Sequence, residues 1–540
     1  MPSHTRKESD DPGGIRFEIR ELLRPDAFPH PVARLELRET HLSWIVLTGR
    51  DAYKIKKALK LDFIDASSLE RRRHYCEEEL RLNRRLAPEL YLDVVPITRT
   101  AGGLRIAGAG EAAEYAVHMR QFDPGDELSS LLEQEAVSLR EIVGLGETLA
   151  RFHLSASVAP WTGSHERTRW TCNTVLDNID QLRSYTKRAG SPPELERLAA
   201  WTHERIADLQ HASREREQSG FFRECHGDLH AGNVVRWLNR LMPFDCIEFD
   251  PNLRWIDVVD DTAFLVMDLT GHRRADLACA LLSRYLEITG DYDGLRLLPF
   301  YAVHRALVRA KVDALTAGQV PERAAALRDR MHGRVRTALH WSARRHPVLI
   351  LMHGLSGSGK SWLSERLVAR VPALRIRSDV ERKRLCGQAG HKPEGFRAGI
   401  YAPEVSRRTY GRLADCAESC LSAGFNTIID AAFLDAADRA LLCRVATRLG
   451  VPHVIVSCEA DRRTLAARIT KRRQEGSDPS DADLAVLDAQ LEACQPLTAS
   501  ERSHAIFADT TLPDSAERVS ASIRALCGDA EGERGETAAF

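Results

Sequence analysis

The sequence predicts two folded domains of different class: an α+β domain with a small β-rich lobe before a large helical lobe, and then an α/β domain with a parallel sheet. Strand patterns gather between residues 40 and 120, and helical patterns dominate from there to about residue 345. Beyond that point, buried apolar strands alternate with helices, which is typical of a parallel sheet covered on both faces. A chain of 540 residues is also too long for one hydrophobic core.

The elements of the first domain follow from alternation and turn residues. Residues 41–48 and 52–56 alternate in polarity around the turn Gly49-Arg-Asp51, which predicts a β-hairpin. A charged helix is expected at about 67–86 and a further strand at 115–119. Long helical patterns then occupy 127–154 and 192–216, and Ala-, Leu- and Arg-rich helical patterns fill 297–345.

The second domain begins where Arg344-Arg-His-Pro347 breaks the helical pattern. Strands and helices then alternate. We expect strands at 348–352, 374–377, 427–430 and 453–457, and helices at 360–371, 403–423, 435–449 and 461–473.

These patterns give the predicted domain limits. The first domain is expected at 15–345 and the second at 346–527. Residues 1–14 and the Gly-rich tail 528–540 are polar, and we expect them to be disordered.

The composition excludes several classes of protein. The formal net charge of −1 argues against nucleic-acid binding through bulk basicity. No apolar run reaches the length of a membrane span, and the polar N-terminus has no hydrophobic signal core. A cytoplasmic protein is therefore expected, without membrane or nucleic-acid partners.

One phosphate-handling motif opens the second domain. Residues 354–361, Gly-Leu-Ser-Gly-Ser-Gly-Lys-Ser, match a complete P-loop between a strand and a helix. Glycines let backbone N–H groups surround phosphate oxygens, the lysine neutralises the β- and γ-phosphates, and the hydroxyl binds Mg²⁺. The context favours this function over a Gly-rich turn. The expected nucleotide-binding residues are Gly354, Ser356, Gly357, Ser358, Gly359, Lys360 and Ser361, with Ser361 also on magnesium.

Two carboxylates follow strands of the same sheet. Asp379 comes just after the strand 374–377, where it could accept the proton of an acceptor hydroxyl as catalytic base; a helix N-cap at Ser378 or Asp379 is an equal alternative. Asp430 ends the strand 427–430, at the edge where ligands bind, and is expected to hold the Mg²⁺ water shell.

A basic helix completes the second set. Arg468 and Arg472 are four residues apart and share one helix face, so they could clamp the transferred phosphate; a solvated basic face is equally consistent. Through the P-loop, Asp379, Asp430 and this helix, the region from 346 to about 525 resembles small-molecule P-loop kinases such as gluconate kinase, adenylylsulfate kinase and zeta-toxin-like proteins.

The other motif lies in the first domain. In residues 226–233, His-Gly-Asp-Leu-His-Ala-Gly-Asn, Asp228 has the position of a catalytic base and Asn233 that of a metal ligand on the same loop. Asp245 follows the apolar stretch 241–244 and supplies a second metal ligand. A hairpin of 234–237 and 241–244 would bring Asn233 and Asp245 close together, while His226 is expected to brace the loop.

These residues resemble the aminoglycoside phosphotransferase family of the protein-kinase-like fold, over about residues 30–340. The resemblance implies that Lys56 contacts the α- and β-phosphates and pairs with Glu79. Lys54 and Lys57 are alternatives to Lys56, and Glu78 is the alternative to Glu79; alternation puts Lys54 and Lys56 on one strand face. It further implies an adenine-binding hinge at 119–122 and a structural anchor among Asp257, Asp260 and Asp261.

The whole chain thus resembles bacterial fusions described as aminoglycoside phosphotransferase/ATP-binding proteins. The leading hypothesis is a bifunctional enzyme in which each domain transfers the γ-phosphoryl group of Mg²⁺-bound ATP to a hydroxyl of a small molecule. Two alternatives stay open: only the P-loop domain is catalytic and the first domain binds a ligand, or the whole chain is an ATP-binding switch.

Overall fold

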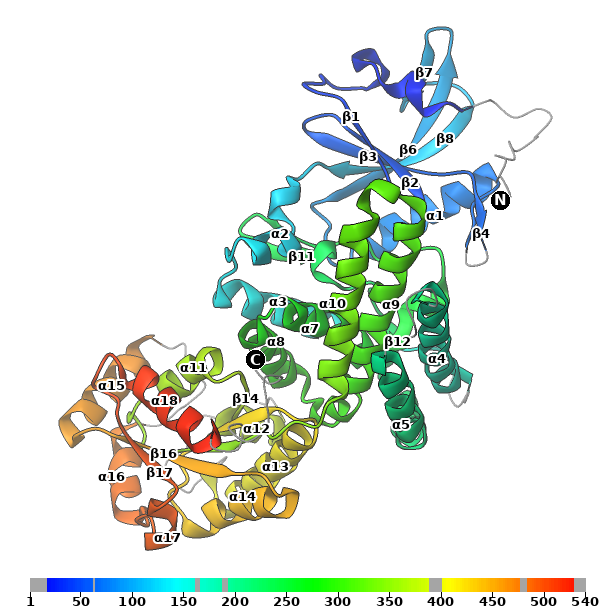
Figure 1. The fold of residues 1–540 in the computed structure, drawn as a ribbon. Helices are drawn as coiled ribbons and strands as arrows, with labels where there is room; N and C mark the ends of the chain where they lie inside the picture. The colour runs from blue at the N-terminus through cyan, green and yellow to red at the C-terminus, as the bar shows by residue number, and fades with distance from the viewer. Residues whose placement is uncertain are drawn as a thin grey trace. The chain divides into compact units, whose positions relative to one another are not determined.

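The computed structural model describes residues 17–61, 64–160, 166–186, 193–387, 401–475 and 483–528 (Figure 1). Of the ends predicted to be disordered, residues 1–14 and 529–540 lie outside this range, as do residues 388–400, whereas Gly528 is the last residue of a helix. The chain divides into two compact units. The first holds the described residues of Met1–Glu141, Ser155–Thr162 and Gly220–Asp261, and the second holds those of Ile142–Leu154, Gly163–Ser219 and Thr262–Phe540.

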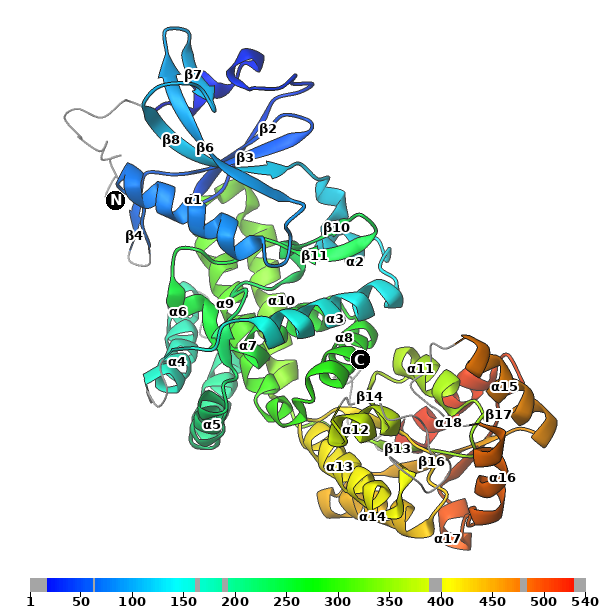
Figure 2. The same ribbon diagram turned by 180° about the vertical axis from the view of Figure 1, so that it is seen from behind.

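An antiparallel sheet of six strands forms the β-rich lobe of the first unit. Its order is β1-β2-β3-β8-β6-β7, and α1 packs against β6 and β8 on one face (Figure 2). The bounds are β1 Glu36–Glu39, β2 Ser43–Leu47, β3 Asp51–Lys56, α1 Leu69–Asn83, β6 Tyr91–Thr100, β7 Gly103–Ile106 and β8 Ala112–Arg120, with a short pair, β4 Lys60–Leu61 and β5 Ile64–Asp65. The predicted lobe of strands with one helix is confirmed.

Strand β3 shows why the two faces of this sheet differ. Tyr53 and Ile55 pack into an apolar cluster on one face. Ala52 packs with Cys76 of α1 in a second cluster, so the alternating Lys54 and Lys56 also point toward the helix. Two lysines are thereby placed on a face that is otherwise buried.

Further elements of the first unit surround the loop of residues 226–233, called the catalytic-type loop below. They are η3 Pro124–Asp126, α2 Leu128–Glu133, β9 Phe222–Glu224, η5 Ala231–Asn233, β10 Val234–Trp237, β11 Arg240–Pro243, α6 Pro251–Arg254 and β12 Trp255–Asp257. β9 pairs with β12 and β10 pairs with β11, both antiparallel. The predicted hairpin is confirmed, and its two turn residues, Leu238 and Asn239, have the positive φ of a tight hairpin turn.

Helices fill the first part of the second unit. They are α3 Leu139–Ser155, α4 Glu166–Thr186, α5 Pro193–Gln218, α7 Val258–Gly271, α8 Ala275–Thr289, η6 Tyr292–Arg296, α9 Leu298–Gln319 and α10 Ala324–Ser342; α3 and α7 begin with residues of the first unit. Among the described residues, none of the helices combines the length and apolar character needed to cross a membrane.

A parallel sheet of five strands forms the rest of the second unit, in the order β14-β15-β13-β16-β17. The predicted parallel sheet is confirmed. Its strands are β13 Leu349–His353, β14 Ala373–Arg377, β15 Asn426–Asp430, β16 His453–Glu459 and β17 Ala505–Asp509; the helices are α11 Lys360–Arg370, α12 Ser378–Leu385, α13 Pro403–Ser422, α14 Ala436–Leu449, α15 Arg462–Glu475, α16 Leu484–Ala493, α17 Ala499–Arg502 and α18 Ser515–Gly528.

Several features differ from the sequence prediction; among them, β1, β7, β17, α4, α7 and α8 were not predicted. The single helix expected at 127–154 is divided into α2 and α3, because Glu135 adopts a left-handed backbone (φ 53°) that no helix can continue. Strand β6 was not predicted and contains Pro96, which argues against a central strand. The structure accommodates it because the pairing of β6 with β7 begins only at Ile97.

Candidate active sites

The loop after β9 forms the centre of the first site. Asn233 Nδ2 donates to both Asp228 Oδ2 and the Asp228 carbonyl oxygen, each at 3.0 Å, which fixes the carboxylate across the loop. His230 Nε2 lies 3.5 Å from the same Oδ2. The Asp228 side chain is 36% exposed, so it is held in place and still open to a second molecule.

His226 and Asp261 brace this loop from within. The backbone N–H groups of His226 and Gly227 donate to the two oxygens of Asp261, at 3.0 and 2.8 Å. Asp261 is therefore the anchor that was expected among three aspartates. His226 is fully buried; its Nε2 lies 2.8 Å from the Phe244 carbonyl, and burial lowers its pKa. A neutral ring in that position is structural, as predicted.

The β10–β11 hairpin brings the predicted metal ligands together. Phe244 N–H donates to the Asn233 carbonyl at 2.9 Å, so Asp245 follows directly beside the catalytic-type loop. Asp245 has a positive φ of 64°, and its side chain is 40% exposed. Desolvation acts to raise the pKa of Asp245, but the charge of Lys54 and its hydrogen bond outweigh this and lower it. The carboxylate is thus ionised and accessible.

Glu79 of α1 joins both lysines of β3. It is fully buried and accepts from Lys54 Nζ at 2.7 Å and from Lys56 Nζ. Lys54 continues to Asp245 at 2.5 Å, whereas Lys56 continues to Glu248, which is buried. Burial acts to lower the pKa of each lysine, and the neighbouring carboxylates reverse this and raise it.

The alternatives at these positions take different places. Lys57 lies on the other strand face and pairs with Glu39. Glu78 binds Arg81 and Arg254 instead of a lysine of β3. In the structure Glu79 therefore points inward, as the sequence pattern predicts. Both lysines bind Glu79, so they differ only in their second partners, Asp245 for Lys54 and Glu248 for Lys56.

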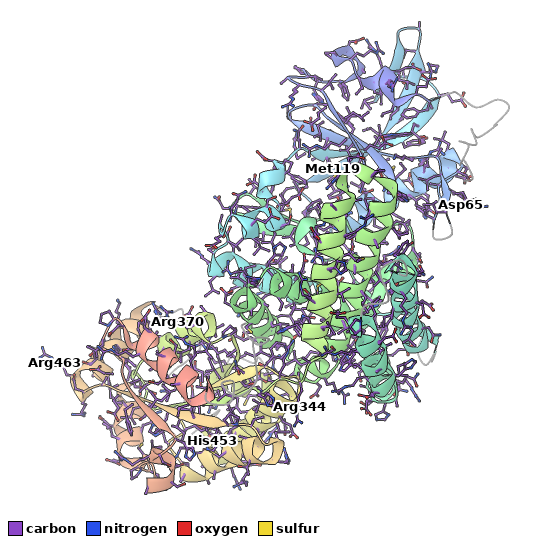
Figure 3. The ribbon with its side chains drawn as sticks, viewed as in Figure 1. Asp65, Met119, Arg344, Arg370, His453 and Arg463 are labelled. Atoms are coloured by element: carbon purple, nitrogen blue, oxygen red, sulfur yellow. The ribbon has the colours of Figure 1, made fainter. Side chains whose placement is uncertain are left out.

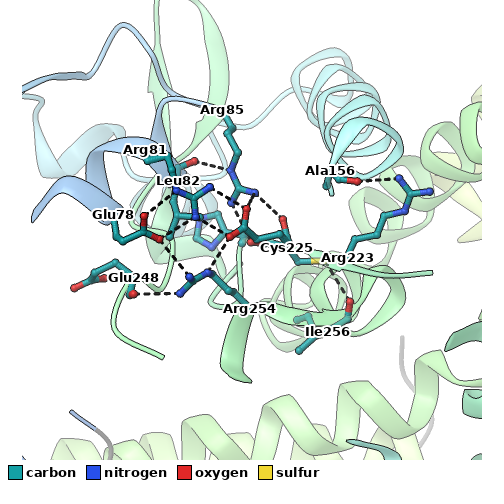
Figure 4. A network of polar contacts seen from close by, with 12 residues as sticks. Glu78, Arg81, Leu82, Arg85, Ala156, Arg223, Cys225, Glu248, Arg254 and Ile256 are labelled. Atoms are coloured by element: carbon teal, nitrogen blue, oxygen red, sulfur yellow. Dashed lines mark hydrogen bonds and ion pairs between the residues drawn. The ribbon is translucent and has the colours of Figure 1, made fainter. Parts of the chain in front are cut away.

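A cluster of charged side chains ties α1 to the strand that precedes the catalytic-type loop (Figure 4). The buried carboxylate of Glu224 on β9 accepts from Arg81 at 2.7 Å, Arg254 at 3.2 Å and Arg85 at 3.3 Å. Arg85 also donates to the Glu224 and Cys225 carbonyls at 2.7 and 3.2 Å. Desolvation acts to raise the pKa of Glu224, but the arginines lower it.

The second site lies at the carboxyl end of the central strand β13. Gly354, Gly357 and Gly359 all have positive φ. A Cβ at Gly357 would lie 2.6 Å from the Leu465 carbonyl oxygen, so only glycine fits. Lys360 begins α11, and its Nζ donates to the Gly354 and Leu355 carbonyls at 2.7 and 2.8 Å. The loop has the geometry of a phosphate cradle at a helix N-terminus. Ser356 and Ser361 line a cavity next to the P-loop, and Ser358 is buried.

Asp430 lies beside the P-loop at the end of β15. Ser361 Oγ is 3.3 Å from Asp430 Oδ1, while Ser364 and Arg375 donate to Oδ2 at 3.1 and 2.7 Å. Burial acts to raise the pKa of Asp430, but Arg375 lowers it. An ionised carboxylate next to a serine hydroxyl is an oxygen donor set suited to Mg²⁺.

A cavity of about 580 Å³ extends from the P-loop to α12 and α13. Asp379 and Arg382 line it and are joined by a hydrogen bond of 2.7 Å. Asp379 is not an N-cap: the cap position of α12 is Arg377, and no side chain makes the capping hydrogen bond. Other polar lining residues include Tyr401, Arg407, Tyr410, Asp435 and Asp438.

Of the two arginines predicted to clamp the phosphate, the structure describes the side chain of Arg468. Arg468 lines the cavity, and its guanidinium donates to Thr510 Oγ1 at 2.8 Å and to the Thr510 carbonyl at 2.9 Å. Thr510 in turn donates to the Ser358 carbonyl of the P-loop at 2.6 Å. The side chain of Arg472 lies outside the described residues.

Several residues of the two sites were missed in the sequence. Arg375 and Ser364, which hold Asp430, and Glu248, which pairs with Lys56, carry no motif. Glu248 follows Asp245 by three residues, and Arg375 alternates with buried residues of β14; neither signal identifies a partner.

Two family models match separate parts of the chain. A family model described as Phosphotransferase enzyme family matches residues 64–298, and one described as AAA domain matches residues 349–497. A gluconokinase from Sinorhizobium meliloti 1021 aligns with 36% of this chain and all of its own, at 16% identity and a TM-score of 0.27. A choline/ethanolamine kinase family protein from Mesorhizobium loti aligns with 58% of this chain and 89% of its own, at 13% identity and a TM-score of 0.36.

Together the folds, sites and family models define a protein with two kinase-like domains, an aminoglycoside-phosphotransferase-type domain fused to a P-loop domain. The chain is 30% identical over 467 residues to uncharacterized protein Rv2004c of Mycobacterium tuberculosis (strain ATCC 25618 / H37Rv). The aligned region covers 85% of this chain and 91% of that protein. The chain belongs to the family of that protein, and the predicted fusion is confirmed.

Proposed function

We propose that this protein is a bifunctional ATP-dependent phosphotransferase in which each domain phosphorylates a hydroxyl group of a small molecule. One observation carries the proposal: each domain assembles a complete set of groups for the phosphates, the metal and the acceptor. A domain that served only to bind a ligand would not need an exposed Asp228 held by Asn233, with the exposed Asp245 on the segment that hydrogen-bonds to the same loop.

In the first domain, Asp228 is the base. Asn233 holds one carboxylate oxygen, and the other receives the proton of the acceptor hydroxyl as the new P–O bond forms and the bond to the leaving ADP breaks. Asp245 and the side-chain oxygen of Asn233 would hold Mg²⁺, which neutralises charge on the phosphates. Lys54, rather than Lys56, contacts the α- and β-phosphates, because it is the lysine that reaches Asp245.

In the second domain, Asp379 is the base. It lines the cavity beside the P-loop, and the hydrogen bond from Arg382 orients its carboxylate. Lys360 and Arg468 neutralise the transferred phosphoryl group, while Ser361 and Asp430 would hold Mg²⁺ or its water shell. In-line attack then depends on positioning and charge neutralisation more than on covalent chemistry.

Full-length variants test the proposal. Wild-type protein is assayed for ADP release with MgATP and a library of sugars, polyols, nucleosides and aminoglycosides. Asp228→Asn should reduce transfer to one set of acceptors by about 10²–10⁴-fold, the usual contribution of a general base. Lys360→Met should abolish transfer to the other set. The surface substitutions Asp208→Asn and Lys60→Met serve as matched controls.

The outcomes separate the alternatives. If Asp228→Asn changes no acceptor's rate while Lys360→Met abolishes all transfer, only the P-loop domain is catalytic. If no acceptor accelerates ADP release in the wild type, the protein is an ATP-binding switch and the proposal is wrong.

A further inference from the structure

Two arginines of the P-loop domain cap a helix that precedes the predicted domain boundary at 345. Arg384 of α12 donates to the Glu287 and Ile288 carbonyls at 2.6 and 3.2 Å, and Arg412 of α13 donates to the Gly290 carbonyl at 2.9 Å. These acceptors form the last turn of α8 and its C-cap, where carbonyls lack partners within the helix. Cations are also favoured at this end of the helix dipole. All of these residues belong to the second compact unit.

A buried carboxylate stands at the centre of these contacts. Glu381 of α12 is almost fully buried and lies 3.3 Å from Arg384, 3.5 Å from Arg412 and 3.5 Å from the Tyr292 hydroxyl. Tyr292 belongs to η6, directly after α8, and its pKa is raised first by burial and then by the charge of Glu381. A charge in such a place is retained only with its partners present.

The same helix covers an edge of the parallel sheet. β14 is an edge strand of that sheet, and its Arg375 N–H donates to Ser283 Oγ of α8 at 3.0 Å. Arg377, at the end of β14, pairs with Glu287 of α8 at 3.2 Å. Edge strands with unpaired N–H groups are commonly covered by a helix, and here α8 does so.

Two faces of helix α12 therefore make different contacts. Asp379 and Arg382, three residues apart, line the cavity beside the P-loop. Glu381 and Arg384, also three apart, face α8 and η6. A shift of α12 away from α8 would also move Asp379, because Asp379, Glu381 and Arg384 all lie on this one helix of eight residues.

We propose that Glu381 and Arg384 are positioning residues for the second phosphotransfer reaction. They dock α12 on α8 and η6, and this contact orients Asp379 toward the acceptor. The acceptor side of the P-loop site is thus completed by helices from before residue 345. This inference rests on the proposed function of the P-loop domain.

Hydrogen–deuterium exchange of the full-length chain tests the docking. In Arg384→Ala, exchange of residues 378–385 should rise about tenfold. The wild type must break the hydrogen bonds from Arg384 to the α8 carbonyls before α12 can open, and the variant lacks these bonds. Arg384→Lys should restore most of the protection, since a lysine can still reach the last carbonyls. Glu381→Gln should give a smaller rise. Arg444→Ala, an exposed arginine of α14, is the matched control.

MgATP separates docking from nucleotide binding. Protection of residues 354–361 by MgATP should be equal in wild type and Arg384→Ala. With the acceptor of the second domain, kcat of Arg384→Ala should fall while KM for ATP is unchanged, and Arg384→Lys should recover the rate.

The inference is overturned if residues 378–385 exchange equally in wild type, Arg384→Ala and Glu381→Gln. It is also overturned if the lysine variant fails to recover the rate that the alanine variant loses. Failure of MgATP to protect residues 354–361 of the wild type would instead contradict the proposed function.

Discussion

Two lysines of β3 share one glutamate, and their second partners distinguish their roles. Lys56 has a side chain only 3% exposed and ends on the buried Glu248. Lys54 is 13% exposed and ends on Asp245, the accessible carboxylate. Strand alternation places both on one face, so no sequence pattern separates them.

We predict opposite effects of removing the two lysines. Lys54→Met should lower kcat of the first domain by about a hundredfold or more, as loss of one charge-stabilising group typically does. Lys56→Met should mainly destabilise the fold, by about 3–5 kcal/mol, because it leaves a buried carboxylate unpaired. Activity assays and denaturant unfolding measure the two effects, with Lys57→Met as control. The reverse pattern would restore Lys56 as the phosphate ligand.

The cavity of the P-loop domain contains a carboxyl group with a shifted pKa. Burial, and then the charge of Asp435, raise the pKa of Asp438 from its ordinary 3.8 to about 6. Between about pH 4 and pH 6 the folded chain holds a proton that the unfolded chain has released. This contribution to stability is therefore present at low pH and is lost as the pH rises through 6.

Asp438→Asn should remove this contribution to the pH dependence. The melting temperature of the wild type should gain more on going from pH 7 to pH 5 than that of the variant does. Asp488→Asn, on the exposed face of α16, should behave like the wild type. Equal pH responses of wild type and Asp438→Asn would contradict the assignment.

At the scale of elements, the position of α1 depends on a charged cluster rather than on apolar packing alone. Arg81 of α1 and Arg85, just after the end of α1, meet Glu224 of β9, which leads directly into the loop of Asp228. Glu79 lies in the same helix. The cluster therefore fixes the distance between the lysines of β3 and the catalytic-type loop.

Glu224→Gln should loosen α1. Its neutral amide leaves three arginines partly buried without their common anion, so the free energy of unfolding should fall, by about 3–5 kcal/mol if the amide finds no partner. Hydrogen–deuterium exchange of residues 69–83 should rise, and transfer by the first domain should decrease. Glu77→Gln, which removes an exposed pair with Arg73, is the control. Unchanged exchange of α1 would show that apolar contacts suffice to hold it.

The helices and strands predicted from periodicity are present in the structure, and the failures described below have physical causes. The P-loop helix and the alternating strands beyond residue 345 follow from periodicity. Met119, labelled in Figure 3, lies near the end of β8, in the strand predicted at 115–119. The division of α2 from α3 was missed because a left-handed backbone at Glu135 leaves no composition signal, and β6 because of Pro96.

At the scale of the molecule, two sites with separate residues predict two independent binding events. Calorimetric titration of the full chain with MgATP should give two sites per chain. Lys54→Met and Lys360→Met should each weaken MgATP binding at one site only, and the double variant should weaken both, because distant substitutions act additively. A single site in the wild type would contradict the proposal of two nucleotide pockets.

The two domain classes, the P-loop motif and the candidate set of Asp228, Asn233 and Asp245 can all be predicted from the sequence alone. Those features depend on short-range spacing: a strand, a turn and a helix in order, or ligands a few residues apart. The folded chain was needed to see which lysine meets Asp245, which arginine holds Asp430 and which helix contacts α12. These pairs are 55 to 191 residues apart in the chain, and local periodicity carries no information about such contacts.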